Sequence, residues 1–302
     1  MAQNTLVSLT NDIYWDGDYS RCHVGNAIET YLRESIQRTP VPLTVVFPKS
    51  DGFISRTYLP NETNPVLPSE TKLKDLESRV PSDSFPVVAA LCSRGIDQPN
   101  ILYLPLDDET FKNGLTKVLS SVPSPAWEAR RPVAFWRGGA SGVERPSIRV
   151  RVVLELDGDP GTDVRITPWG NWEREQNIPP HLFAPRCGLA EHFQCKYLLI
   201  VDGNCIASNH QWVFGSGAVP IMITHPENRY WFQRYLKPMV NYVPIKYDLS
   251  DLKEKISWLR EHDTEAKQIA ENALAFSCEV FSPEFQRKYI DDELSRCAGK
   301  IA

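Results

Sequence analysis

The stretch CKYLLIVDGNCIASNHQWVFGSGAVPIM, residues 195–222, joins two apolar runs through an acidic residue and a glycine. The first run, residues 197–201, ends at Asp202 and Gly203, and the second occupies residues 219–223. Short runs that are apolar at every position are typical of parallel strands covered on both faces. The carboxyl end of such a strand lies at the edge where open α/β sheets bind ligands. The stretch therefore predicts an α/β fold with a ligand site after residue 201.

Further apolar or β-branched runs recur along the chain, at residues 43–47, 87–92, 101–106, 133–138 and 242–245. Helical signals gather towards the end of the chain. Asp248 and Thr264 are placed to cap two amphipathic helices, and PEFQRKYIDDELSRC follows as a third amphipathic segment. The pattern predicts two Rossmann-like lobes and a C-terminal helical closure.

The 302 residues suit two domains of about 150 residues each. The proline-rich stretch SSVPSPAWEARRP, residues 120–132, is the predicted boundary between them. We therefore expect an N-terminal lobe over residues 1–125 and a C-terminal lobe over residues 126–275. Residues 276–302 are expected to form a helix that packs back toward the N-terminal lobe.

Composition narrows the possible partners. The formal net charge of −5 argues against an electrostatic hold on nucleic acid or on an anionic membrane. No apolar stretch approaches the roughly 20 residues that span a bilayer, and the polar start lacks the regions typical of a signal peptide. Seven cysteines without a CxxC pair favour a reducing compartment. We expect a cytoplasmic protein, which for a viral chain means the host cytoplasm, with no membrane span and no nucleic-acid partner.

A second informative stretch is VAFWRGGASGVERP, residues 133–146. Glycines after a strand let backbone amides approach a ligand, and the start of a helix offers free N–H groups. Arg137 and Arg145 add planar groups suited to phosphate. The stretch predicts a diphosphate-binding loop, with a tight turn and solvated arginines as the alternative. The segment SIRVRVVLEL that follows fits a strand or a helix equally.

Small and polar residues follow the Asp-Gly pair. Ala207, Ser208, Asn209 and His210 would line the start of the next helix, close enough to contact phosphate or sugar. The alternative is an Asp-Gly turn between two core elements.

In this order, the two stretches resemble the capsule-associated and Rumi-type glycosyltransferases, which include the protein O-glucosyltransferases and related xylosyltransferases. The resemblance is carried by FWRGGASGVER, by CKYLLIVDGNCIASNHQWVFGSGAVPIM, and by the segment that begins YLKPMVNYVPIKYDLSDL. It covers roughly residues 133–276, and the first 130 residues resemble the family only loosely.

The resemblance implies a GT-B-type fold with the nucleotide sugar between two lobes. It implies an inverting transfer of xylose or glucose from a UDP-sugar to a hydroxyl of a glycan or glycoprotein. The implied residues that bind the sugar donor are Arg137, Gly138, Gly139, Ser141, Arg145, Thr167, Asp202, Gly203, Ala207, Ser208, Asn209 and His210. The chain departs from the family where two usual arginines fall at Ala140 and Asn209, and Arg145 and His210 are candidates to replace them.

Inverting transfer needs a carboxylate that takes the proton of the acceptor hydroxyl. In the family this base follows a strand of the N-terminal lobe in an Asp-x-Pro context, which here matches Asp97, followed by Gln98 and Pro99. A solvated turn aspartate is the alternative reading of Asp97. Asp107 and Asp108 are the substitutes.

Two rival functions are open. Asp157-Gly158-Asp159 is a DxD string of the kind that holds a metal beneath a diphosphate, although a surface turn is the simpler interpretation. A nucleotide-sugar or glycan-binding module that has lost catalysis is the other rival, favoured by the missing arginines. The six histidines lack the HExxH spacing of zinc hydrolases, so the sequence does not indicate an enzyme of that class. We expect no tightly bound cofactor and no requirement for a divalent metal.

Overall fold

The computed structural model describes eleven segments, residues 5–8, 26–38, 43–47, 53–55, 85–90, 92–95, 101–105, 107–142, 144–168, 176–204 and 206–299. The chain forms two compact units. Unit 1 comprises residues 1–114, 227–234 and 282–302, and unit 2 comprises residues 115–226 and 235–281. The domain boundaries predicted from the sequence, at residues 125 and 275, remain predictions.

Unit 1 is built on a sheet of four parallel strands in the order β1-β2-β4-β6. These strands are β1 (Thr5–Ser8), β2 (Leu43–Phe47), β4 (Phe85–Ala90) and β6 (Ile101–Tyr103). A smaller sheet joins β3 (Phe53–Ser55), β5 (Cys92–Arg94) and β11 (Asn228–Arg229). The helices among its described residues are α1 (Asn26–Arg38), α3 (Asp108–Asn113) and α10 (Pro283–Gly299), and they contact one another.

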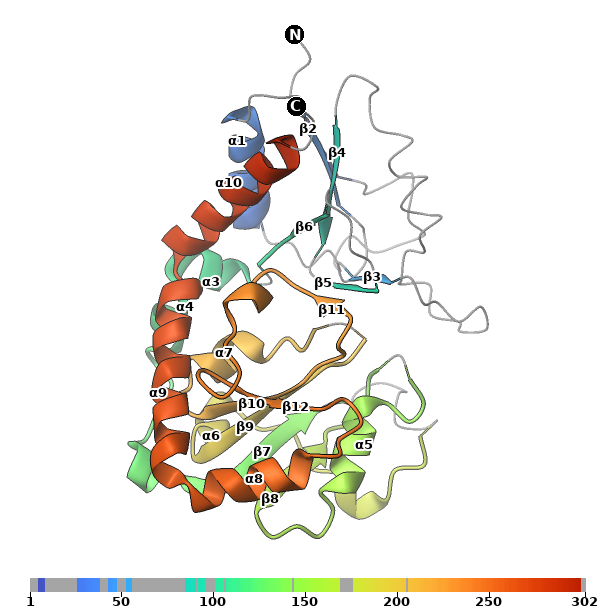
Figure 1. The fold of residues 1–302 in the computed structure, drawn as a ribbon, viewed down its shortest axis with the longest axis vertical. Coiled ribbons are helices and arrows are strands. Elements are labelled where there is room, and N and C mark those ends of the chain that lie inside the picture. The colour runs from blue at the N-terminus through green and yellow to red at the C-terminus, as the bar shows by residue number, and fades with distance from the viewer. Residues whose placement is uncertain are drawn as a thin grey trace. The chain divides into compact units, whose positions relative to one another are not determined.

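Unit 2 is built on five parallel strands in the order β12-β10-β9-β7-β8 (Figure 1). The strands are β7 (Arg131–Gly138), β8 (Thr162–Ile166), β9 (Cys195–Val201), β10 (Val219–Ile223) and β12 (Val243–Ile245). The chain starts at β7, adds β8 on one side, and then adds β9, β10 and β12 on the other. This order is that of a doubly wound sheet.

Both faces of the unit 2 sheet are covered. Every residue of β9 and β10 is buried. On one face Tyr197, Leu199 and Val201 join a core cluster that includes residues of α5 (Ile148–Glu155), α8 (Leu252–Glu261) and the first half of α9 (Asp263–Val280). Short helical elements complete the unit: α4 (Leu115–Leu119), η2 (Trp127–Ala129), η3 (Pro180–Leu182), α6 (Leu189–His192) and α7 (His210–Phe214). Helix η4 (Gln233–Tyr235) lies where the chain passes between units.

Local hydrogen bonds decide two helix starts. The ambiguous segment after residue 146 is a helix, because the Ser147 side chain caps α5 by accepting from the Val150 N–H. The predicted Asp248 cap is wrong, since α8 begins at Leu252 with Asp251 as its N-cap residue. Asp248 instead accepts from the Ser250 N–H at 3.0 Å, which closes the turn before the helix.

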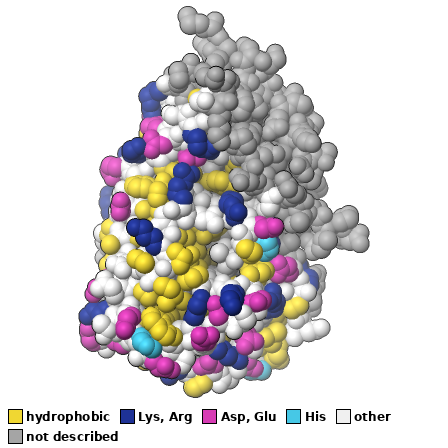
Figure 2. All heavy atoms as spheres, viewed as in Figure 1, with side chains coloured by type: hydrophobic (Ala, Val, Ile, Leu, Met, Phe, Trp, Pro, Cys, Tyr) yellow, Lys and Arg dark blue, Asp and Glu magenta, His cyan; other side chains and the backbone are white. Residues whose placement is uncertain are grey.

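The predicted α/β class is confirmed, because both units are built on parallel sheets. Among the described residues no helix is long and apolar enough to cross a membrane. Figure 2 shows acidic and basic side chains interspersed over the described part of the viewed face, with apolar side chains between them.

Candidate functional site

The unit 2 sheet has its switch point between β7 and β9. The connection after β7 leads to β8 on one side, and the connection after β9 leads to β10 on the other. In doubly wound sheets the loops that leave two such strands diverge, and ligands bind in the crevice between them. The loop after β7 carries Gly139 and Ser141, and the loop after β9 starts with Asp202 and Gly203. The topology therefore brings the two informative stretches to one place.

The loop after β7 is held firmly at Ala140. The Ala140 carbonyl accepts from Ser147 Oγ at 2.9 Å and from Gln176 Nε2 at 2.8 Å, and the Gln176 Oε1 accepts from the Ser147 N–H at 2.7 Å. Gly138 is required for packing, because a Cβ there would lie 2.4 Å from the ring of Trp136. Hydrogen bonds to Ser147 and Gln176 therefore hold the loop in place.

Asp202 links two strand ends. Its Oδ2 accepts from Thr224 Oγ1 at 2.6 Å and from the His225 N–H at 3.1 Å, and the residue is 1% exposed. Both partners follow β10, the neighbouring strand. The carboxylate at the end of β9 thus fixes the loop after β10 to the sheet edge.

Arg149, on α5, bridges the two switch-point loops. Its Nη1 donates to Ser141 Oγ at 2.8 Å and to the Gly139 carbonyl at 3.3 Å. Its Nε donates to the Val201 and Asp202 carbonyls at 3.1 and 3.2 Å. Sequence reasoning missed this residue, since it stands in a segment whose period fitted a strand and a helix alike.

Gly203 makes room for this bridge. A Cβ at position 203 would lie 3.0 Å from Cζ and Nη2 of Arg149 and 3.0 Å from Ser141 Oγ. These separations are shorter than ordinary van der Waals contact. A glycine at the end of β9 therefore lets the Arg149 guanidinium and the Ser141 hydroxyl approach the strand.

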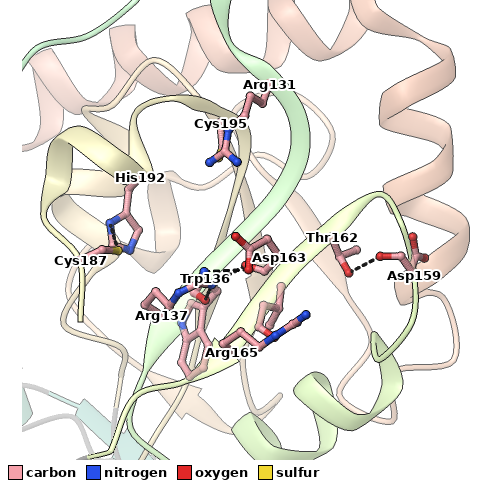
Figure 3. A network of polar contacts seen from close by, with 11 residues as sticks. Arg131, Trp136, Arg137, Asp159, Thr162, Asp163, Arg165, Cys187, His192 and Cys195 are labelled. Carbon is pink, nitrogen blue, oxygen red and sulfur yellow. Dashed lines mark hydrogen bonds and ion pairs between the residues drawn. The ribbon is translucent and has the colours of Figure 1, made fainter. Parts of the chain in front are cut away.

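Arg137 lies on the opposite face of β7 from Trp136, because side chains alternate along a strand. Its Nη2 pairs with Asp163 Oδ1 at 2.7 Å, and its Nη1 donates to the Asp163 carbonyl at 2.8 Å (Figure 3). The guanidinium also lies 4.3 Å from the ring centre of Phe135. Arg137 is thus held by the neighbouring strand β8, and its predicted contact with phosphate stays a prediction.

The remaining predicted residues have varied surroundings. The exposed Arg145 donates to the Gly142 and Glu144 carbonyls of its own loop. His210 is 1% exposed, and its Nδ1 lies 2.6 Å from the Ala207 carbonyl. The catalytic candidate Asp97 lies outside the described residues.

Asn209 Nδ2 donates to the Leu199 carbonyl, and Ala207 is buried while Ser208 is exposed. Thr167 follows β8, and its buried hydroxyl has no hydrogen-bond partner among the described residues. The described residues of the predicted donor site therefore lie on the strands of the unit 2 sheet or in the segments that follow them, and several of them have protein partners.

A further cluster of side chains joins three loops at the same edge of the sheet. Tyr247, which follows β12, donates its hydroxyl to Glu144 Oε1 at 2.9 Å, and its ring lies edge-on to His225 with centroids 4.8 Å apart. Arg151 Nη1 lies 3.7 Å from Glu144 Oε2. These contacts join the loops after β7, β10 and β12. No sequence pattern predicts these contacts, because they depend on the order of the strands in the sheet.

Behind Arg137, His192 is packed between aromatic rings. Its ring lies edge-on to Phe135 and Trp212, with centroids 5.0 and 4.9 Å away. Its Nδ1 lies 2.9 Å from the Gly188 carbonyl and 3.6 Å from Cys187 Sγ (Figure 3). Burial lowers the pKa of His192 below its usual 6.5, and burial likewise raises the pKa of the Cys187 thiol to about 11. The Cys187 thiol therefore stays protonated and weakly nucleophilic at neutral pH.

We expect His192 to make stability depend on pH. Because the folded state favours the neutral ring, its contribution is complete above the unfolded pKa of about 6.5 and declines as the pH falls below it. In His192→Asn, whose amide can still donate to the Gly188 carbonyl, the loss of melting temperature between pH 7 and pH 5 should be smaller than in the wild type. An equal loss in both proteins would show that His192 titrates normally.

The DxD string lies at the other edge of the sheet. Asp157 and Asp159 fall between the end of α5 and the start of β8, at the amino edge. Asp157 Oδ2 lies 2.9 Å from His181 Nε2, and Asp159 Oδ1 accepts from the Gly161 N–H at 2.8 Å. In the part of the chain that the structure describes, no three His, Cys, Asp or Glu side chains are grouped to hold a metal.

Fold and site together define a doubly wound α/β protein whose glycine-containing loops meet at the switch point of a parallel sheet. The chain belongs to glycosyl transferase family 90, which matches residues 109–295. That match includes all of the switch-point loops described above.

Several relatives share part of the sequence. Protein O-glucosyltransferase 2 of Danio rerio is 32% identical over 147 residues, which are 48% of this chain and 28% of that protein. Protein O-glucosyltransferase 3 of Rattus norvegicus is 30% identical over 174 residues, covering 56% and 33%. Uncharacterized protein 179R of Invertebrate iridescent virus 6 is 27% identical over 227 residues, covering 62% and 19%. The chain thus spans a third or less of the length of these relatives.

Among solved structures, Anabaena HepE in complex with UDP-glucose is 12% identical, with a TM-score of 0.49 and coverage of 89% of this chain and 76% of that chain. An α-glucosyltransferase in complex with UDP and a 13-mer DNA is 11% identical, with a TM-score of 0.44 and coverage of 96% and 100%.

Proposed function

We propose that this chain is a UDP-sugar-dependent glycosyltransferase that moves glucose or xylose, with inversion, to a hydroxyl of a glycan or glycoprotein. Membership of glycosyl transferase family 90 supports the reaction class. The observation that carries the proposal is the junction at the switch point, where Arg149 joins Ser141 to the end of β9. Backbone amides, hydroxyls and positive charge that lie close together favour the binding of a nucleotide diphosphate.

The proposed roles are donor binding and proton transfer. Gly139, Ser141 and Gly203 would lie against the diphosphate, where N–H and O–H groups stabilise the charge that develops as UDP leaves. Asp97 would take the proton of the acceptor hydroxyl as the new glycosidic bond forms. The bond from the sugar to the diphosphate breaks in the same step, so the configuration at the anomeric carbon inverts.

We further propose that the reaction does not depend on a metal held by Asp157 and Asp159. Both carboxylates lie at the amino edge of the unit 2 sheet, and both already contact protein groups. The rival metal-dependent mechanism requires activity to vanish with a chelator and in Asp159→Asn. Transfer that continues under both conditions would eliminate that rival.

We expect UDP to raise the melting temperature of the protein, because a ligand that binds only the native state stabilises it by mass action. At 100 times the dissociation constant the gain is about 2.7 kcal/mol. ADP and GDP should raise the melting temperature markedly less at the same concentration, and equal shifts from all three nucleotides would remove the case for a uridine site.

A screen of UDP-glucose, UDP-xylose, UDP-galactose and UDP-N-acetylglucosamine for hydrolysis then identifies the sugar donor. The same screen separates the enzyme from a module that only binds. A binding module would shift its melting temperature with UDP but release no sugar from any UDP-sugar. The cytoplasmic location and the absence of a nucleic-acid partner stay predictions from the sequence.

A further inference from the structure

The first turn of α5 holds the loop after β7 at two separate points. Ser147, the N-cap residue, donates to the Ala140 carbonyl, and Arg149, two residues on, donates to Gly139 and Ser141 on either side of it. Ser147 and Arg149 therefore hydrogen-bond to three consecutive residues of the loop. These bonds join the loop and the start of α5 into one hydrogen-bonded segment.

Arg149 extends that hydrogen-bonded segment to the other switch-point loop. Its Nε donates to the Val201 and Asp202 carbonyls, at the last residue of β9 and the first residue after it. The guanidinium lies 5.8 Å from the ring centre of Trp136, which limits its movement on the side of β7. Since Gly203 leaves no Cβ in its way, one planar group reaches acceptors on both sides of the switch point.

We propose that Arg149 is a positioning residue of the sugar-donor site, which sets the separation between the loop at Gly139–Ser141 and the end of β9. The identity of the ligand, a UDP-sugar, rests on the proposed function. The contacts of Arg149 with the two loops do not depend on that function. Guanidinium suits this task because its donors are fixed in one plane, whereas a lysine ammonium can satisfy fewer of the four acceptors at once.

The test compares Arg149→Met and Arg149→Lys with Arg165→Met as a matched control. Arg165 lies on β8 of the same sheet, and its Nη1 donates to the Val164 carbonyl of its own strand. Calorimetry with UDP should show Kd about 10- to 100-fold higher in Arg149→Met, the range for lost hydrogen bonds to a charged group. Arg149→Lys should recover part of that loss, and Arg165→Met should bind as the wild type does.

Steady-state kinetics distinguishes a positioning role of Arg149 from a general loss of structure in the variant. KM for the UDP-sugar should rise with Kd in Arg149→Met, while kcat falls by less than KM rises. Unchanged Kd and KM in Arg149→Met would overturn the proposal. A fall in kcat alone, without a change in binding, would also overturn it.

Hydrogen exchange tests the positioning itself without any ligand. In Arg149→Met, the amides of residues 139–142 and 202–204 should both exchange faster, whereas those of β9 should not change. If the wild type binds no UDP, the proposed function fails and this measurement still decides the positioning role. Unchanged exchange in both loops would overturn the inference even in an active enzyme.

Discussion

Exchange of Asp97 for asparagine is expected to lower kcat by about 10²- to 10⁴-fold, the usual contribution of a general base, while Kd for UDP changes little. Asparagine keeps the size and polarity of aspartate but cannot take a proton. The assignment rests on the Asp97-Gln98-Pro99 context after an apolar run, and on the family resemblance. The measurement is kcat for sugar transfer in the wild type and in Asp97→Asn, with UDP affinity by calorimetry as the second readout.

Asp107 and Asp108 serve as controls, because the structure shows what each carboxylate does. Asp107 caps α3 by accepting from the Thr110 N–H at 2.7 Å. Asp108 Oδ1 accepts from the Ala27 and Ile28 N–H groups at the start of α1, and its Oδ2 pairs with Lys112 at 2.5 Å. Asparagine caps a helix about as well as aspartate, and its amide oxygen can still accept from backbone N–H groups. Either substitution should therefore change stability little and leave kcat largely intact, although Asp108→Asn loses the ion pair with Lys112.

The opposite pattern of activities would assign the general base to a different residue. If Asp97→Asn transfers sugar at the wild-type rate while Asp107→Asn or Asp108→Asn is inactive, the base lies after β6, one strand later than predicted. The melting temperatures of all three variants show whether a loss of activity reflects unfolding.

The parallel sheet of unit 2 could be predicted because its central strands carry their own signal. β9 and β10 are buried at every position, and the sequence is apolar at nearly every one of those positions. The edge strand β8 went unpredicted, since TDVRI is only five residues long and lies in a stretch dense in glycine and proline. A strand that is apolar at nearly every position gives a stronger signal than a short strand with two apolar residues.

The edge strand β8, which was not predicted, explains why the surroundings of Arg137 differ from those expected from the sequence. The sequence places this arginine just before a glycine loop, which suggested phosphate. The register pairs Phe135 with Asp163 on β8, and that pairing brings the Asp163 carboxylate to the guanidinium. Without β8, no sequence pattern could supply the partner.

The same reasoning applies to the Asp-Gly pair. The sequence correctly predicted that it follows a buried strand. It could not predict that Asp202 would bind Thr224, twenty-two residues away, because that contact follows from the adjacency of β9 and β10. Local patterns locate a strand end, but the strand order decides which groups meet there.

Gly203→Val is expected to weaken UDP binding by about 10²-fold and to lower stability by about 1 to 3 kcal/mol. Overpacking costs about 1 to 3 kcal/mol, and displacing Arg149 from its acceptors loses hydrogen bonds to a charged group as well. A Cβ alone would lie 3.0 Å from the Arg149 Cζ and from Ser141 Oγ, and the two methyl groups of valine add to this overlap. Calorimetry with UDP and thermal unfolding measure the two effects separately.

Gly188→Val is the matched control for Gly203→Val. Gly188 is the N-cap residue of α6, has φ −82° and has no heavy atom within 4 Å of a built Cβ, so valine meets no obstacle there. Both substitutions add the same side chain to unit 2, and neither glycine needs a positive φ, so a difference between them isolates the contacts with Arg149 and Ser141. The double variant Gly203→Val with Arg149→Met should bind UDP no more weakly than Gly203→Val alone, because the guanidinium is already displaced. If Gly203→Val keeps the wild-type affinity, or if the two substitutions add independently, Gly203 does not act through Arg149.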